Sequence, residues 1–269
     1  MNHQCLTGTG MASALITPHG ANVLSWCTSN GVERLFLSRT ATIQSGHAIR
    51  GGVPIIFPQF GGPGLLRHGF ARTIDWTLLD ASDERACYRL SASEETLLRW
   101  PHSFQLQFEI RLLPERLSMI LKVVNTGSDH FSFTGALHTY LRVTSLGEAY
   151  VPGLQDRSFF DEVTGKHLID SAPALRFDGL IDRLYPNAAA QEIPIHTGFG
   201  DIHIVSEGFK DLVLWNPGPK AAASLVDLHP GGYQNFVCVE SAMIQNPISL
   251  GPDEQWHGSQ TLVLRDSLP

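Results

Sequence analysis

The segment from Arg50 to Arg72, RGGVPIIFPQFGGPGLLRHGFAR, combines residue types that suit the binding of a small anion. It lies within residues 34–74, a stretch with no Asp or Glu in a chain whose formal charge is -7. The cationic and titratable residues of this stretch are Arg34, Arg39, Arg50, Arg67 and Arg72, with His47 and His68. Because a guanidinium offers a planar set of donors that matches phosphate and carboxylate oxygens, we expect an anion site centred on Arg50 and Arg72. The alternative is that these arginines are solvated or pair with distant acids.

Glycine and proline determine the backbone path of this segment. They are Gly51, Gly52, Gly61, Gly62, Gly64 and Gly69, with Pro54, Pro58 and Pro63. Glycine allows backbone to approach a ligand closely, and proline fixes the backbone. The pattern predicts a rigid loop beside the ligand, although these residues also simply make turns.

His138 is a candidate proton donor or acceptor. It belongs to the run Phe131–Val143, in which Phe131, Phe133, Leu137, Leu141 and Val143 alternate with Ser132, Thr134, Ala136, His138, Tyr140 and Arg142. This alternation predicts a strand with one apolar and one polar face, and the polar face could line a groove. An imidazole titrates near neutrality, so His138 could move a proton there. The alternative is a surface histidine, or one that is hydrogen-bonded for structural reasons.

Glu240 is a candidate base. The run Asn235–Ser241 is apolar on both faces, as expected of a central strand, and Glu240 lies near its predicted end. A carboxylate in such a place is costly unless it is paired or used, and partial burial would raise its pKa. The alternatives are a glutamate in solvent beyond the strand and one paired with an arginine.

Other kinds of chemistry have weaker support. The 12 histidines form no HxH or HExxH pattern, and no phosphate loop, dinucleotide fingerprint or nucleophile elbow is present. We therefore expect no metal and no cofactor. Trp215, followed by Asn216 and Pro217, ends a predicted strand and could offer an aromatic platform for a sugar, or could simply be a buried tryptophan.

The predicted fold is all-β, in one domain over residues 1–269. Period-two alternation is clear over Phe104–Leu112 and Leu117–Val123. Further strands are expected at Ser13–Pro18, Asn22–Trp26, Thr73–Leu79, Ala86–Ala92, Phe131–Val143, Asp201–Val205, Leu212–Trp215, Asn235–Val239 and Gln260–Arg265. One short helix is expected at Glu94–Trp100, before Pro101, and Tyr150–Pro194 is expected to form loop-rich insertions on a rim. Many short strands with turns between them indicate a sandwich or barrel.

Composition narrows the class of protein. With 43% hydrophobic residues the chain can bury a large core, and its acidic balance argues against a nucleic-acid or anionic membrane surface. No signal peptide or membrane span is evident. Cys5, Cys27, Cys87 and Cys238 show no CxxC spacing, so we expect reduced thiols in a cytoplasmic protein.

Several segments taken together resemble one known family. They are RGGVPIIFPQFGGPGLLRHGFAR, ALHTYLRV, GLIDRLYPN, LVLWNPGPK and FVCVESA, preceded by GANVLSW and GVERLF. In this order they resemble the hexose-6-phosphate mutarotases, the glucose-6-phosphate 1-epimerase branch of the galactose-mutarotase-like superfamily. The RGGVP and HGFAR segments are characteristic of the phosphosugar branch.

The resemblance implies a β-supersandwich with the sugar in an open cleft on one broad sheet, and it assigns roles to particular residues. It implies that His138 and Glu240 are the catalytic pair, that Arg50 and Arg72 contact the phosphate and the sugar, and that Asp182 and His68 lie at the substrate. Arg67 stands where the family often has glutamine, so it either adds a phosphate contact or turns to solvent. Gly218 stands where the family often has tryptophan.

The expected function is interconversion of the α and β anomers of a hexose 6-phosphate, without a cofactor and by a monomer. Ring opening at C1 needs one base and one acid, which Glu240 and His138 would supply. One alternative is an epimerase for unphosphorylated aldoses, which would not account for the acid-free arginine segment. The other is a carbohydrate-binding sandwich without turnover, which the presence of both an acid and a base disfavours.

Overall fold

The computed structural model describes residues 3–62 and 67–265, whose strands pair into three antiparallel sheets. The prediction of an all-β protein is confirmed. A seven-stranded sheet has the order β12-β11-β14-β17-β18-β9-β4, and a nine-stranded sheet has the order β13-β10-β15-β16-β19-β8-β7-β6-β5. A three-stranded sheet, in the order β1-β2-β3, completes the fold.

The strands have the following bounds. The seven-stranded sheet contains β4 (Ile55–Ile56), β9 (Phe131–Arg142), β11 (Ser158–Asp161), β12 (Lys166–Ile169), β14 (Ile181–Tyr185), β17 (Asp211–Asn216) and β18 (Phe236–Leu250). The nine-stranded sheet contains β5 (Thr77–Ala81), β6 (Arg85–Ser91), β7 (Phe104–Leu113), β8 (Arg116–Asn125), β10 (Tyr150–Pro152), β13 (Ala174–Arg176), β15 (Ile193–His196), β16 (Asp201–Glu207) and β19 (Gln255–Arg265). The small sheet contains β1 (Gln4–Thr7), β2 (Ser13–Ile16) and β3 (Val23–Cys27).

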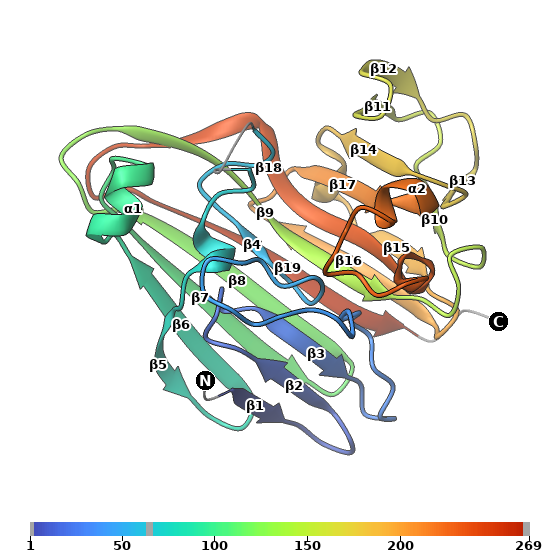
Figure 1. The fold of residues 1–269 in the computed structure, drawn as a ribbon, viewed down its shortest axis with the longest axis horizontal. Helices are drawn as coiled ribbons and strands as arrows, with labels where there is room; N and C mark the ends of the chain where they lie inside the picture. The colour runs from blue at the N-terminus through green and yellow to red at the C-terminus, as the bar shows by residue number, and fades with distance from the viewer. Residues whose placement is uncertain (1–2, 63–66, 266–269) are drawn as a thin grey trace.

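Helical segments are short. Among the described residues they are α1 (Glu94–Arg99), α2 (Gly218–Ala222), and the 3-10 turns η2 (Ala71–Thr73), η3 (Ala188–Ala190) and η4 (Gly232–Asn235). The predicted helix at Glu94 is confirmed as α1, where the Ser93 side chain accepts a hydrogen bond from the Thr96 backbone N–H. Figure 1 shows α1 at one end of the molecule and β11, β12 and α2 at the other.

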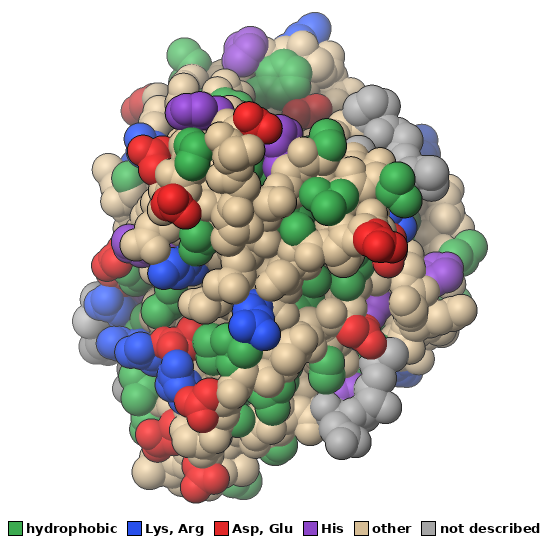
Figure 2. Space-filling view, turned by 90° about the vertical axis from the view of Figure 1, so that its left-hand side faces the viewer, with side chains coloured by type: hydrophobic (Ala, Val, Ile, Leu, Met, Phe, Trp, Pro, Cys, Tyr) green, Lys and Arg blue, Asp and Glu red, His purple; other side chains and the backbone are tan. Residues whose placement is uncertain are grey.

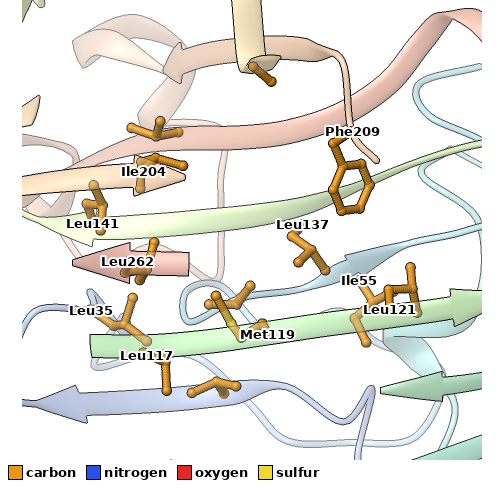
Figure 3. Close-up of a cluster of buried hydrophobic side chains, with 14 of the residues drawn as sticks. Leu35, Ile55, Leu117, Met119, Leu121, Leu137, Leu141, Ile204, Phe209 and Leu262 are labelled. Carbon is orange, nitrogen blue, oxygen red and sulfur yellow. The ribbon is translucent and has the colours of Figure 1, made fainter. Parts of the chain in front are cut away.

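The main core lies between the two large sheets. Leu117, Met119 and Leu121 of β8 belong to the same buried cluster as Leu137 and Leu141 of β9. Figure 3 shows these side chains together with Ile204 of β16 and Leu262 of β19. The apolar residues of β9 therefore face inward, as their alternation predicted.

The polar residues of β9 consequently lie on the other face of the seven-stranded sheet. His138 is paired in register with Glu240 of β18, and Tyr140 is paired with Cys238. Trp215 of β17 is opposite Cys238, and Asp182 of β14 is opposite Trp215. Since alternate residues of a strand share a face, these side chains occupy one face of the sheet.

Three predictions about elements were wrong. Thr73–Leu79 is not one strand, because η2 occupies its start and β5 begins only at Thr77. Tyr150–Pro194 is not mainly loop: it contributes short strands to both large sheets. The strand predicted to end at Val239 runs on to Leu250, so Glu240 lies well inside β18.

Three glycines of the Arg50–Arg72 segment, Gly51, Gly52 and Gly69, lie against neighbouring backbone. Gly69 has a φ of +66°, and a Cβ there would lie 1.9 Å from the Phe57 carbonyl oxygen. Gly52, with a φ of +69°, would place a Cβ 2.3 Å from the Val23 carbonyl oxygen. A side chain at either position would collide with neighbouring backbone. Residues 63–66, which include Pro63 and Gly64, lie outside the described residues.

All four cysteines are free. Within residues 3–62 and 67–265, no helix is long and apolar enough to span a membrane. On the face seen in Figure 2, acidic and basic side chains are interspersed rather than gathered into one positive surface.

Candidate functional site

His138 and Glu240 form a buried pair on neighbouring strands. Their side chains meet with His138 Nε2 3.4 Å from Glu240 Oε1. His138 is 7% exposed and Glu240 only 1%. The structure therefore excludes both a surface histidine and a glutamate in solvent, and it brings together the two residues that the sequence singled out separately.

Burial shifts the pKa values of the two members of the pair in opposite directions. Burial and then the nearby Asp182 raise the pKa of Glu240, which Arg72 partly offsets. Burial, followed by the charges of His68, Arg72 and Arg50, lowers the pKa of His138. Both shifts favour the neutral form of each group, and the protonation of two ionisable groups in contact is coupled.

Arg50 is connected to this pair through Tyr140. Arg50 Nη1 donates to the Tyr140 hydroxyl at 3.0 Å, and Arg50 Nε donates to Asp227 Oδ1 at 3.1 Å. The Tyr140 ring stacks on His138 with centroids 4.9 Å apart and planes 8° apart. Burial opposes the charge of Arg50, but Tyr140 and Asp227 outweigh it and raise the pKa of the guanidinium.

Arg72 lies near the same point and keeps its charge. Its Nη2 donates to the Arg67 carbonyl oxygen at 3.1 Å. Burial lowers the pKa of Arg72 to about 10, so the group is still cationic at neutral pH. The Arg67 side chain is exposed, as in the second of the two alternatives for it, although its charge still influences the pKa of His68 and that of Asp182.

His68 presents a neutral ring beside His138. The two ring centroids are 6.0 Å apart, and the Gly61 backbone N–H donates to His68 Nδ1 at 3.3 Å. Burial, and then Arg72, Arg67 and Arg50, lower the pKa of His68 to about 3. Since Nδ1 accepts a hydrogen bond, the neutral ring carries its proton on Nε2 and can donate it in a hydrogen bond.

Asp182 and Trp215 complete this face of the sheet. Trp215 is half-buried and meets His138 edge to face, with centroids 5.9 Å apart. Burial and then Glu162 raise the pKa of Asp182 to about 6, while Arg67 opposes the shift. A carboxylate and an indole side by side can bind the hydroxyls and the apolar face of a sugar ring.

Three buried polar atoms around this point have no hydrogen-bond partner among the described residues. They are Arg72 Nε, His138 Nδ1 and Glu240 Oε2. Most buried polar groups in proteins are satisfied, and an unpaired group calls for an explanation such as a ligand. Their gathering around one point indicates where a polar ligand would bind.

Two residues of this site were missed by the sequence reasoning. Tyr140 had a signal, because it is two residues after His138 on the same predicted face. Asp227 had none, because it lies 177 positions from Arg50 in a segment without a recognisable pattern.

Other cavities lie elsewhere on the protein. One of about 240 Å³ is lined by Trp100, Thr134 and Pro247 among others, and one of about 470 Å³ by residues that include Arg39 and Arg142. Neither is lined by His138 or Glu240. In the described part of the chain no three His, Cys, Asp or Glu side chains gather in a way that could hold a metal ion.

A family model described as aldose 1-epimerase matches residues 3–262, nearly the whole chain. The chain belongs to the aldose 1-epimerase family. As a member of that family it is an isomerase, which confirms the resemblance drawn from the sequence segments.

Relatives of this aldose 1-epimerase family member include proteins provisionally named glucose-6-phosphate 1-epimerase. One from Cenchrus ciliaris is 36% identical, over 94% of this chain and 82% of its own length. Another from Escherichia coli K12 is 34% identical, over 90% of this chain and 84% of its own length.

Solved structures agree with the fold. A crystal structure of a protein from Salmonella typhimurium, provisionally named a mutarotase, has a TM-score of 0.87 and 31% identity, covering 95% of this chain and 88% of that one. A galactose mutarotase-like protein from Lactobacillus casei has a TM-score of 0.76, with 98% and 100% coverage. At 17% identity it shows only the fold, which confirms the predicted mutarotase-like β-sandwich.

Proposed function

We propose that this protein interconverts the α and β anomers of a hexose 6-phosphate, with glucose 6-phosphate as the preferred candidate. The observation that carries the proposal is the cluster of unpaired polar atoms on His138, Glu240 and Arg72. A buried acid and base beside two guanidiniums fit a substrate with a hemiacetal at one end and a phosphate at the other. The names of the Cenchrus ciliaris and Escherichia coli relatives support the same substrate.

In the proposed reaction Glu240 takes the proton from the C1 hydroxyl while His138 gives a proton to the ring oxygen. The C1–O5 bond then breaks, which leaves an open-chain aldehyde and a hydroxyl at C5. Rotation about C1–C2 exposes the other face of the carbonyl, and the two proton transfers run in reverse as the ring closes. Protons and electrons balance without any oxidant or metal.

The starting form for this route is the ion pair, with the proton on His138. It contains the same number of protons as the neutral pair that burial favours in the empty site. Moving one proton between Glu240 Oε1 and His138 Nε2, which are 3.4 Å apart, converts one form into the other. The pair can therefore begin and end a turnover without exchanging a proton with solvent.

The surrounding groups would position the substrate. Arg50 and Arg72 would bind the phosphate, Asp182 would accept hydrogen bonds from ring hydroxyls, and His68 Nε2–H would donate to a sugar oxygen. Arg67 would reinforce the positive field from the surface. Because every group in this scheme belongs to one chain, we propose that a monomer is sufficient for the reaction.

The test is anomer exchange, measured by NMR on glucose 6-phosphate, glucose and galactose with the same enzyme sample. We expect glucose 6-phosphate to exchange fastest, and EDTA to leave its rate unchanged. Faster exchange of a free aldose would support the unphosphorylated-sugar alternative. Binding of a sugar without any acceleration would support the non-catalytic one.

A further inference from the structure

Asp227 is an acidic residue placed directly against the proposed phosphate site. It lies between α2 and η4, and its Oδ1 accepts a hydrogen bond from Arg50 Nε at 3.1 Å. The two side chains are partly buried, at 21% exposed for Arg50 and 29% for Asp227. A carboxylate on the guanidinium that is to bind a phosphate competes with that phosphate for positive charge.

We infer that Asp227 is a specificity-determining residue that holds Arg50 in place and limits how tightly the site binds phosphate. This inference rests on the proposed function, because it concerns the phosphate of the same substrate. The carboxylate keeps Arg50 oriented when the site is empty, and repels the phosphate when the site is filled. A product phosphosugar can then leave, and inorganic phosphate is a weaker competitor.

The position of Asp227 is built by contacts rather than by an unrestrained loop. The Thr40 hydroxyl donates to the Asp227 carbonyl oxygen at 3.0 Å, and the His229 backbone N–H donates to the Ser38 hydroxyl at 3.1 Å. The His229 ring also stacks on Phe36, with centroids 5.7 Å apart. These contacts hold the backbone at Asp227 and at His229, so Asp227 stays near Arg50 when a phosphate arrives.

Tyr140 shows why the orientation of Arg50 matters for the reaction. The Tyr140 hydroxyl accepts from Arg50 Nη1, and the Tyr140 ring is stacked on His138. A displaced Arg50 would therefore disturb the ring that packs against the proposed acid. Asp227 and Tyr140 hold the guanidinium from two directions and leave its remaining N–H groups for the phosphate.

Asp227→Asn is the sharpest test, because the amide keeps an oxygen that can accept from Arg50 Nε and removes only the charge. Inorganic phosphate is titrated into the protein by calorimetry at two salt concentrations. We expect the dissociation constant for phosphate to fall about tenfold, with a larger fall at low salt, where charges are less screened. The ratio of KM for glucose 6-phosphate to KM for glucose should fall in parallel.

Two further variants separate charge from orientation. Asp227→Ala removes the acceptor as well, so Arg50 loses its anchor and the gain in phosphate affinity should be smaller. Asp129→Asn, an exposed residue in the turn before β9, makes the same change in net charge and should leave phosphate affinity as it was. Circular dichroism verifies folding, and Asp227→Ser replaces the Asn variant if that one does not fold.

Phosphate binding that is unchanged or weaker in Asp227→Asn would overturn the inference, and so would an equal gain in Asp129→Asn. Calorimetry does not depend on turnover. A parent protein that binds phosphate but does not exchange anomers would contradict the proposed function while leaving the role of Asp227 open to the same measurement. An active parent with no effect of Asp227→Asn would contradict only the inference.

Discussion

At the residue scale, His138 and Glu240 lie in surroundings that oppose the charge of each, and this shared burial makes their protonation interdependent. An isolated buried carboxylate or imidazolium is costly, but a pair that holds one proton can keep it as two neutral groups or as an ion pair. The substrate would then receive a proton from one member and give a proton to the other. This arrangement suits a reaction that returns to its starting protonation state after every turnover.

Loss of either proposed proton carrier should strongly reduce turnover. We expect His138→Ala and Glu240→Gln each to lower kcat for anomer exchange by roughly a hundredfold or more. Binding of glucose 6-phosphate, measured by calorimetry, should largely survive. His257→Ala, an exposed histidine of β19, is the control and should keep the parent rate. Near-normal turnover in Glu240→Gln would mean that another residue is the base.

The raised pKa of Asp182 predicts a pH-dependent stability. Its folded pKa of about 6 exceeds the ordinary value of 3.8, so ionising it costs folding energy as pH rises between these values. A shift of about two units would correspond to about 3 kcal/mol for a fully buried group, and for this partly exposed one we expect about 1–2 kcal/mol. Thermal unfolding of Asp182→Asn should give a higher Tm than the parent at pH 7.5, with the difference vanishing near pH 4.

Asp178→Asn is the matched control for this prediction, because Asp178 is exposed and carries the same charge. We expect no comparable gain in Tm from it at either pH. A gain from Asp182→Asn that persisted unchanged at pH 4 would show that the effect comes from packing and not from the charge.

The sequence best predicted single residues whose types are unusual for their position. Alternation placed His138 on a polar face, and an apolar run made Glu240 conspicuous. Periodicity alone could not place the two together, because the register between β9 and β18 depends on the pairing of segments about a hundred residues apart. Only the family resemblance named them as a pair. Asp227 is beyond such reasoning for the same physical reason: its contact with Arg50 exists only after the chain has folded.

At the scale of elements, the Arg50–Arg72 segment combines a structural and an electrostatic role. Gly52 and Gly69 let it pack closely against neighbouring backbone near β3 and β4, and its two partly buried arginines face the proposed acid and base. The composition of the segment predicted a positive field, and in the structure Arg72, Arg67 and Arg50 lower the pKa of His68. The purpose of the glycines was not predicted, because close approach to a ligand and close approach to backbone require the same residue.

Removing the arginines one at a time tests this segment. Arg50→Ala and Arg72→Ala should each lower kcat/KM for glucose 6-phosphate by roughly ten- to a hundredfold, since a charge-assisted contact contributes about 1.5–3 kcal/mol. The loss on glucose should be much smaller. Steady-state anomer exchange on both sugars gives the comparison, and an equal loss on both would make the segment structural and favour the free-aldose alternative.

Arg67→Ala and Arg39→Ala extend the same experiment. Arg67 is exposed but acts on the pKa of Asp182, so its loss should weaken phosphosugar recognition less than that of Arg72. Arg39 is an exposed arginine from the same acid-free stretch, and its removal should have no effect on either sugar. If Arg39→Ala lowered kcat/KM for glucose 6-phosphate as much as Arg50→Ala does, the arginines would act through a general positive field rather than through a phosphate-binding site.

At the scale of the whole molecule, the proposed site depends on the packing of two sheets. Strand alternation predicted the sandwich because one face of β7, β8 and β9 is consistently apolar. The short strands between Tyr150 and Pro194 were missed because their runs are too short for a period to emerge. Their hydrogen bonds come from other strands: β14 pairs with β17 and β15 with β16, and the remaining short strands pair with other short strands at the sheet edges. This is a tertiary effect.

Gln260 is the centre of a small polar cluster in this mainly apolar interface. It is fully buried on β19, and it accepts a hydrogen bond from the Thr139 hydroxyl. Its Nε2 donates to the Val239 carbonyl oxygen at 3.2 Å and to the Ser241 hydroxyl at 2.8 Å. Thr139 follows His138 in the chain, and Val239 and Ser241 flank Glu240. Gln260 therefore ties the nine-stranded sheet to the two strands that carry the pair, directly behind it.

Gln260→Met should therefore reduce both stability and turnover. It keeps the side-chain volume but leaves the buried Thr139 hydroxyl without its partner, which costs about 1–3 kcal/mol of unfolding free energy in urea titrations. Because β9 and β18 lose their shared anchor, kcat for anomer exchange should fall roughly tenfold while KM changes little.

Adding Thr139→Val should recover part of the stability, since an unpaired hydroxyl is then removed, but not the turnover. Leu262→Met, on the same inward face of β19, is the control and should alter neither quantity by as much. If Gln260→Met unfolds at the same urea concentration as Leu262→Met and keeps the parent kcat, the two sheets position the pair without this residue.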